Sequence, residues 1–117
     1  MNIKKYLFLA LALLFSSSAF SFVFPLSECS SLGYEKTALL VYMPGCVHCQ
    51  YFAPVYESIS NKEKYKSWKF YKVTHKEFTR ICQRETEGCP STYINQLRTV
   101  KLGAVSAEEL ERFLDGG

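Results

Sequence analysis

Short continuous hydrophobic runs alternate along this chain with segments in which hydrophobic residues recur at helical spacing. Thr37–Met43 is a continuous apolar run containing β-branched and aromatic residues, and it ends at Pro44-Gly45. This pattern predicts a strand that is buried on both faces. Over Cys46–Ser60 the hydrophobic residues follow the i, i+3, i+4, i+7 spacing of one helical face, which predicts a helix that continues past an internal Pro54 with a kink. Its apolar positions are Phe52, Val55, Tyr56 and Ile59.

The second half of the chain repeats this alternation. Together the segments predict the order β-α-β-α-β-β-α, a central mixed sheet flanked by helices in the α/β class. Residues 22–36 have no clean period and predict a lead-in with one helical turn near Ser27–Leu32. The further expected strands are Lys69–Val73, Tyr93–Ile94 and Thr99–Leu102, the last two forming a hairpin, and the further expected helices are Lys76–Glu85 and Ser106–Leu114.

The first 21 residues have the composition of a secretory signal peptide. Asn2–Lys5 is basic, Tyr6–Phe15 is apolar, and the following small residues indicate cleavage after Ser21. The apolar segment is about half of the ~20 residues that span a bilayer, so we expect cleavage and no stable membrane insertion. We therefore expect a signal peptide at 1–21 and one domain at 22–117, a monomer located in a bacterial periplasm or secreted. The absence of a retention tetrapeptide at Asp115–Gly117 favours the periplasm over the endoplasmic reticulum.

The charge of the chain argues against nucleic-acid binding. Loss of the signal peptide removes Lys4 and Lys5 and lowers the formal net charge from +3 to +1. A nucleic-acid surface needs a strongly basic patch. The lysines interleaved with aromatic residues over 62–76 are therefore interpreted as a solvated strand face, and no nucleic-acid partner is expected.

The candidate chemistry lies in Cys46-Val47-His48-Cys49, directly after the first predicted buried strand. A Cys-x-x-Cys at the start of a helix places the first sulfur near unpaired backbone N–H groups and the positive end of the helix dipole, which favour a thiolate. Cys46 is thus the expected nucleophile and Cys49 the thiol that resolves a mixed disulfide, with the His48 imidazole stabilising the thiolate or moving a proton. The other interpretations are a static disulfide or half of a zinc site, and zinc normally requires a second cysteine pair of similar spacing.

Several motifs together resemble the thioredoxin superfamily, and most closely the domains of protein disulfide isomerases. Leu40–Cys49 followed by Phe52–Pro54 resembles the active-site segment, Gly88–Ser91 resembles the cis-proline loop, and Gly103–Leu114 resembles the closing glycine and last helix. The resemblance implies a trimmed thioredoxin-like fold without a cofactor. It also implies that Pro90 is a cis-proline whose loop, including Cys89, binds substrate backbone.

The sequence also departs from that pattern. Relatives often carry tryptophan at the position of Gly45, and a buried acid that assists proton transfer from the resolving cysteine at the position of Leu40. Val47 replaces a usual glycine or proline, and Cys89 replaces threonine, valine or tyrosine.

All five cysteines lie after the predicted signal peptide, and their number is odd. A disulfide between Cys82 and Cys89, with six residues intervening, is favoured because an exported chain rarely leaves such a pair free. Cys29 would then be the odd thiol. The alternative is that Cys89 stays free, exchanges with the Cys46/Cys49 dithiol or completes a metal site.

These observations predict an exported thiol–disulfide oxidoreductase of the oxidase or isomerase kind. Its expected partners are proteins with thiols or disulfides and an unidentified redox partner that recycles the dithiol. One alternative is a periplasmic disulfide reductase. Another is a module that binds or delivers a soft metal such as copper through Cys46, Cys49 and Cys89, with His48 as a further ligand.

Overall fold

Strand β2 (Thr37–Tyr42) lies at the centre of a five-stranded mixed sheet with the order β1-β3-β2-β4-β5. β1, β3 and β2 run parallel, whereas β4 is antiparallel to β2 and β5 is antiparallel to β4. The computed structural model describes residues 22–116, so the predicted signal peptide lies outside the described residues. The other strands are β1 (Val23–Pro25), β3 (Lys69–Thr74), β4 (Ser91–Ile94) and β5 (Thr99–Leu102).

The predicted α/β class, mixed sheet and hairpin are confirmed, and two strands differ from the prediction. β4 begins two residues earlier than predicted, because Ser91 and Thr92 pair with β2. β1 has no counterpart in the predicted order, since three residues ending in a proline carry no periodic signal. Its extended conformation comes from pairing with Phe70–Lys72 of β3.

The helices occupy the predicted segments. α2 spans Val47–Ser60 and contains Pro54, α3 spans His75–Cys82, and α4 spans Ala107–Gly116. Helix α3 ends three residues before the predicted Glu85, because Gln83 adopts a left-handed conformation that ends the helix. The predicted helical turn is confirmed as the 3₁₀ turn η1 (Cys29–Ser31), and a second 3₁₀ turn, η2 (Glu63–Tyr65), was not predicted. Among residues 22–116, no helix has the length and apolar composition needed to cross a membrane.

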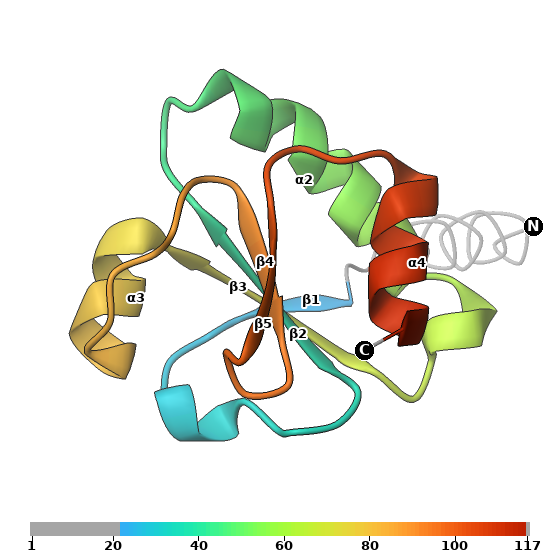
Figure 1. Ribbon diagram of the computed structural model, residues 1–117, viewed down its shortest axis with the longest axis horizontal. Coiled ribbons are helices and arrows are strands. Elements are labelled where there is room, and N and C mark those ends of the chain that lie inside the picture. The colour runs from blue at the N-terminus through green and yellow to red at the C-terminus, as the bar shows by residue number, and fades with distance from the viewer. Residues whose placement is uncertain (1–21, 117) are drawn as a thin grey trace, which may run out of the picture.

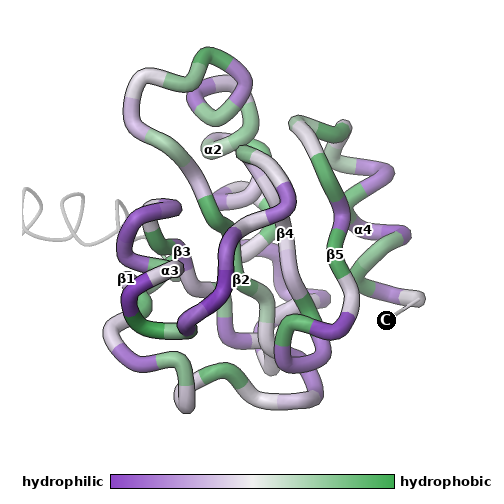
Figure 2. The backbone as a smooth tube through the Cα atoms, turned by 60° about the vertical axis from the view of Figure 1, so that its left-hand side comes forward, coloured by the Kyte–Doolittle hydropathy of each residue, from purple (hydrophilic) through white to green (hydrophobic). Residues whose placement is uncertain are grey.

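Helices cover both faces of the sheet, so the domain has two hydrophobic clusters. One cluster lies between the sheet and α2 with α4, and includes Leu40, Phe52 and Tyr56. The other lies on the α3 and η1 side and includes Leu39, Val41 and the buried Phe78. Figure 1 shows α2 and α4 close to each other and α3 on the far side of the sheet. In Figure 2 hydrophobic and hydrophilic residues alternate along α4, as expected for a helix that packs one face against a core.

The predicted Cys82–Cys89 disulfide is wrong: Cys29 is bonded to Cys82, and Cys89 is a free thiol. The parallel pairing of β1 with β3 carries the following segment to the α3 side of the sheet, where η1 packs against α3. The Cα atoms of Cys29 and Cys82 are therefore 5.1 Å apart despite a sequence separation of 53. A separation in this range suits a disulfide.

Candidate active site

Cys46 lies at the carboxyl end of the central strand, in the turn that leads into α2. Gly45 has φ +82°, a left-handed backbone conformation that glycine adopts without steric cost. The backbone N–H of Cys46 donates to the carbonyl of Met43 at 3.1 Å, which closes the turn. Cys46 is thus the N-cap residue of α2, as the sequence predicted. Tryptophan, which relatives often carry at position 45, would adopt this backbone conformation only with strain.

The start of α2 provides donors for the Cys46 sulfur. The backbone N–H of Cys49 donates to Cys46 Sγ at 3.3 Å. Hydrogen bonding from the Cys49 side chain, and then from the backbone N–H groups of Cys49 and His48, lowers the pKa of Cys46 below its ordinary value. Cys46 is also partly exposed. A partly exposed thiol with a lowered pKa has the properties of a nucleophile.

Cys49 has the opposite character. Its side chain is only 6 % exposed, and burial, followed by the hydrogen bond to Cys46, raises the pKa of Cys49 to about 11. At neutral pH the reduced pair therefore holds one proton, on Cys49, when Cys46 is a thiolate. This asymmetry suits one attacking and one resolving thiol.

A pocket of about 330 Å³ lies beside Cys49, between α2 and the ends of the parallel strands. Leu40, at the position where relatives often carry an acid, lines the same pocket as the resolving thiol. The charged residues of the lining are Glu57 of α2 and Lys72 of β3. Neither residue is recognisable as part of a site from the sequence, because a glutamate on a helix and a lysine on a strand are ordinary surface residues until the fold brings them together.

The loop before β4 lies against the first cysteine. The Cys89–Pro90 peptide bond is cis. The Cys46 thiol donates to the carbonyl oxygen of Cys89, with 3.8 Å between sulfur and oxygen, and the backbone N–H of Gly103 donates to the Pro90 carbonyl at 2.8 Å. Residues far apart in the sequence thus meet at Cys46.

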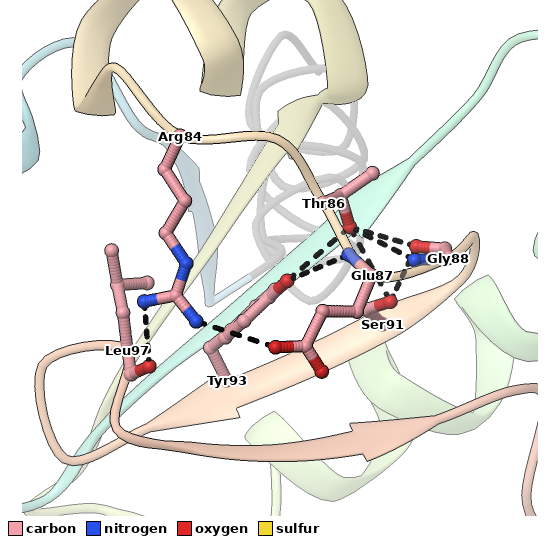
Figure 3. Close-up of polar contacts among 7 residues, drawn as sticks. All are labelled: Arg84, Thr86, Glu87, Gly88, Ser91, Tyr93 and Leu97. Carbon is pink, nitrogen blue, oxygen red and sulfur yellow. Dashed lines mark hydrogen bonds and ion pairs between the residues drawn. The ribbon is translucent and has the colours of Figure 1, made fainter.

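A polar network holds the loop in this position (Figure 3). Thr86 Oγ1 donates to the Gly88 carbonyl at 2.8 Å, and the Ser91 hydroxyl donates to the same carbonyl. The Tyr93 hydroxyl accepts from the backbone N–H of Glu87 at 3.2 Å. These groups were not identified from the sequence; the hydroxyl residues on either side of a Gly-Cys-Pro turn were the available signal.

Arg84 connects this loop to the hairpin. Its guanidinium donates to the Leu97 carbonyl at 2.9 Å, lies 3.5 Å from the Glu87 carboxylate, and is 5.5 Å from the centre of the Tyr93 ring (Figure 3). Both ends of the loop are therefore attached to β4 and to the turn that follows it.

His48 is exposed at the first turn of α2. Its effect on the Cys46 thiolate in the structure comes from its backbone N–H. The contribution expected from the imidazole stays a prediction.

Within residues 22–116, no group of three or more histidine, cysteine, aspartate or glutamate side chains is arranged to hold a metal ion. The arrangement of Cys46, Cys49 and Cys89 therefore gives no support to the soft-metal alternative.

Comparison with protein families agrees with this geometry. The model of the family described as thioredoxin matches residues 31–115, most of the chain. The chain belongs to the thioredoxin family. A comparison with curated protein sequences gives no significant match.

Solved thioredoxin structures are similar to this family member in fold. The thioredoxin Mala s 13 of Malassezia sympodialis aligns with a TM-score of 0.67 and 18 % identity over 83 % of this chain and 91 % of its own. Thioredoxin NaTrxh of Nicotiana alata aligns with a TM-score of 0.64 and 20 % identity over 82 % of this chain and 92 % of its own. The J-Trx1 fragment of ERdj5 aligns with a TM-score of 0.64 and 21 % identity over 81 % of this chain and 51 % of that fragment. The predicted thioredoxin-like fold is confirmed.

Proposed function

We propose that this chain is an exported thiol–disulfide oxidoreductase that oxidises protein thiols or isomerises protein disulfides through Cys46 and Cys49. The observation that carries the proposal is the asymmetry of the pair. Cys46 is partly exposed and its pKa is lowered, whereas Cys49 is buried with a pKa of about 11. Of the two thiols, Cys46 is the more accessible and the more readily ionised, as expected of an attacking cysteine.

In the oxidising direction a substrate thiolate attacks Cys46 Sγ of the Cys46–Cys49 disulfide. The bond between the two cysteines breaks, and Cys49 leaves and takes up a proton. A second substrate thiolate then attacks the substrate sulfur of the mixed disulfide, which forms the substrate disulfide and releases Cys46 as a thiolate. The substrate loses two electrons and the dithiol gains them, so a recycling oxidant must remove them again.

The preference for this direction rests on the leaving group. Donors at the start of α2 stabilise the Cys46 thiolate and hence the reduced protein. A more stable reduced form makes the disulfide more oxidising. His48 is included in the proposed site because an imidazolium beside Cys46 would add to this stabilisation.

The proposed substrates are polypeptides with exposed apolar segments. Three hydrophobic side chains around Cys46 are exposed: Met43 at 41 %, Val47 at 56 % and Tyr51 at 73 %. They lie close to Cys46 in the sequence, and the backbone of Cys89, in the loop that resembles the family's substrate-binding cis-proline loop, would pair with an extended chain. A surface of this kind fits an incompletely folded protein.

The decisive experiment is the redox potential of the Cys46/Cys49 pair, measured by equilibration with glutathione buffers and quantified after acid quench and alkylation. A potential above about −200 mV supports the oxidase or isomerase, whereas one near about −270 mV indicates the reductase. Reactivation of a reduced, unfolded disulfide protein by the oxidised chain provides the matching activity assay. A potential that cannot be assigned to this pair in any buffer would refute the proposed function.

Export is a separate part of the proposal and has its own test. Expression of the full-length chain in a bacterium, followed by fractionation and intact-mass analysis, should give a periplasmic product that begins at Phe22. A cytoplasmic product of full mass would refute export without affecting the redox proposal.

A further inference from the structure

Three thiols are free in the described residues, and the bond between Cys29 and Cys82 leaves Cys89 without its nearest cysteine in sequence. Cys89 is in the loop that contacts the nucleophile, where its carbonyl oxygen is 3.8 Å from Cys46 Sγ. The side chain is half-buried and packs at the edge of the second hydrophobic cluster.

The three sulfurs also influence one another electrostatically. Burial, and then the charge of Cys46, raises the pKa of Cys89, and Cys89 contributes in turn to the raised pKa of Cys49. The position of Cys89 rests on the contact between its carbonyl oxygen and Cys46 Sγ, and these electrostatic effects agree with it.

We propose that Cys89 is a second resolving thiol, which can release a substrate from Cys46 by forming a Cys46–Cys89 disulfide. This inference rests on the proposed function, because it needs a mixed disulfide on Cys46. The Cys89 thiolate attacks Cys46 Sγ, a new bond forms between Cys46 and Cys89, and the bond to the substrate breaks. The substrate sulfur leaves as a thiolate and takes up a proton, and no external oxidant or reductant is required. Cys49 then attacks Cys46 in the same way, which regenerates the Cys46–Cys49 disulfide and frees Cys89.

The geometry favours this exchange over metal binding. A metal site built from Cys46, Cys49 and Cys89 would need all three sulfurs around one point, and no group of three or more such ligands exists among residues 22–116. Exchange needs only one pair of sulfurs to meet at a time, and the Cys89 backbone already contacts Cys46 Sγ.

A second route for resolving the mixed disulfide on Cys46 also has a chemical purpose in this chain. Cys49 is buried and its pKa is about 11, and Leu40 replaces the acid that relatives often place beside it. Burial raises the pKa of Cys89 as well, so the second route rests on the position of the Cys89 loop against Cys46 and not on a more reactive thiol. A neighbouring thiol shortens the lifetime of trapped substrate.

The test uses the variant C49A and oxidised glutathione as the probe, chosen because it is symmetric and attack on either sulfur gives the same adduct. The variant, with Cys46 and Cys89 reduced and the Cys29–Cys82 bond intact, is mixed with the probe, quenched with acid at intervals, alkylated, and mapped by peptide mass spectrometry without reduction. The expected product is a linked peptide that joins Cys46 to Cys89, with two glutathione molecules released per chain. In C49A/C89S, where a hydroxyl replaces the thiol, the glutathione adduct on Cys46 should persist at least about tenfold longer.

Two results would overturn the proposal while leaving the proposed function intact. In one, C49A keeps its glutathione adduct as long as C49A/C89S does. In the other, the linked peptide joins Cys89 to Cys82, which would show that Cys89 exchanges with the structural disulfide. The unmodified protein shows whether a failure concerns Cys89 alone or the proposed function as well. If it forms no Cys46–Cys49 disulfide with the same probe, the proposed function itself fails.

Discussion

The bond between Cys29 and Cys82 should provide a large share of the stability of this small domain. It closes a loop with a sequence separation of 53. In the chain-entropy description, a loop of this length removes enough freedom from the unfolded chain to stabilise the fold by about 4 kcal/mol. Domains of this size have about 5 to 15 kcal/mol in total, so reduction should bring the protein close to unfolding.

The assay compares one sequence in two redox states, which leaves side-chain packing unchanged. In C46A/C49A/C89A only Cys29 and Cys82 remain, and urea unfolding is followed by circular dichroism with the pair oxidised or reduced. At a typical slope for a domain of this size, the two midpoints should differ by about 3 M.

The matched control is C29A/C46A/C49A, which keeps only Cys82 and Cys89. If those two can be joined, their much shorter ring should stabilise the fold by about 2 kcal/mol. A difference below about 1 kcal/mol in the first variant, or equal stabilisation in both, would refute the reasoning from loop length.

Three further predictions concern the site. Cys46→Ser should reduce the reaction with oxidised glutathione to the uncatalysed rate, since the nucleophile is lost; glutathione release at the original rate would place the nucleophile elsewhere. His48→Pro removes a backbone N–H and should raise the pKa of Cys46, which is measured by titrating thiolate absorbance against pH. His48→Ala keeps that N–H and therefore measures the effect of the imidazole alone. An unchanged titration curve for the proline variant would contradict the role of the backbone N–H. The Cys49 pKa is raised from 9.0 to about 11 in the fold, so its neutral thiol stabilises the reduced protein fully below pH 9 and this contribution is lost as pH rises to about 11. Urea melts between pH 9 and about 11 should show the unfolding free energy of the reduced protein falling by up to about 3 kcal/mol, and this fall should be absent in Cys49→Ala. An equal fall in the unmodified protein and in Cys49→Ala would contradict the prediction.

Local patterns in the sequence determined the central elements and the reacting pair. β2 is recognisable because a strand buried on both faces is continuously apolar, and α2 because its hydrophobic spacing continues through Pro54. The position of Cys46 and Cys49 at the start of that helix follows from the end of the apolar run. The lowered pKa of Cys46 was expected for the same reason, because the N-terminal donors belong to the helix itself, whereas the raised pKa of Cys49 comes chiefly from burial in the folded chain.

Pairing across space was decided only by the tertiary structure. β1 is extended because β3 lies beside it, and this pairing carries Cys29 to α3, where it reaches Cys82. Sequence proximity favoured Cys89 instead, but bond formation depends on the distance between two sulfurs in the folded chain. Cys89 consequently stays free beside Cys46, and Glu57 and Lys72 line a pocket with Cys49 although they belong to different elements. These juxtapositions depend on how the helices pack against the sheet, and no local pattern of residues records that packing.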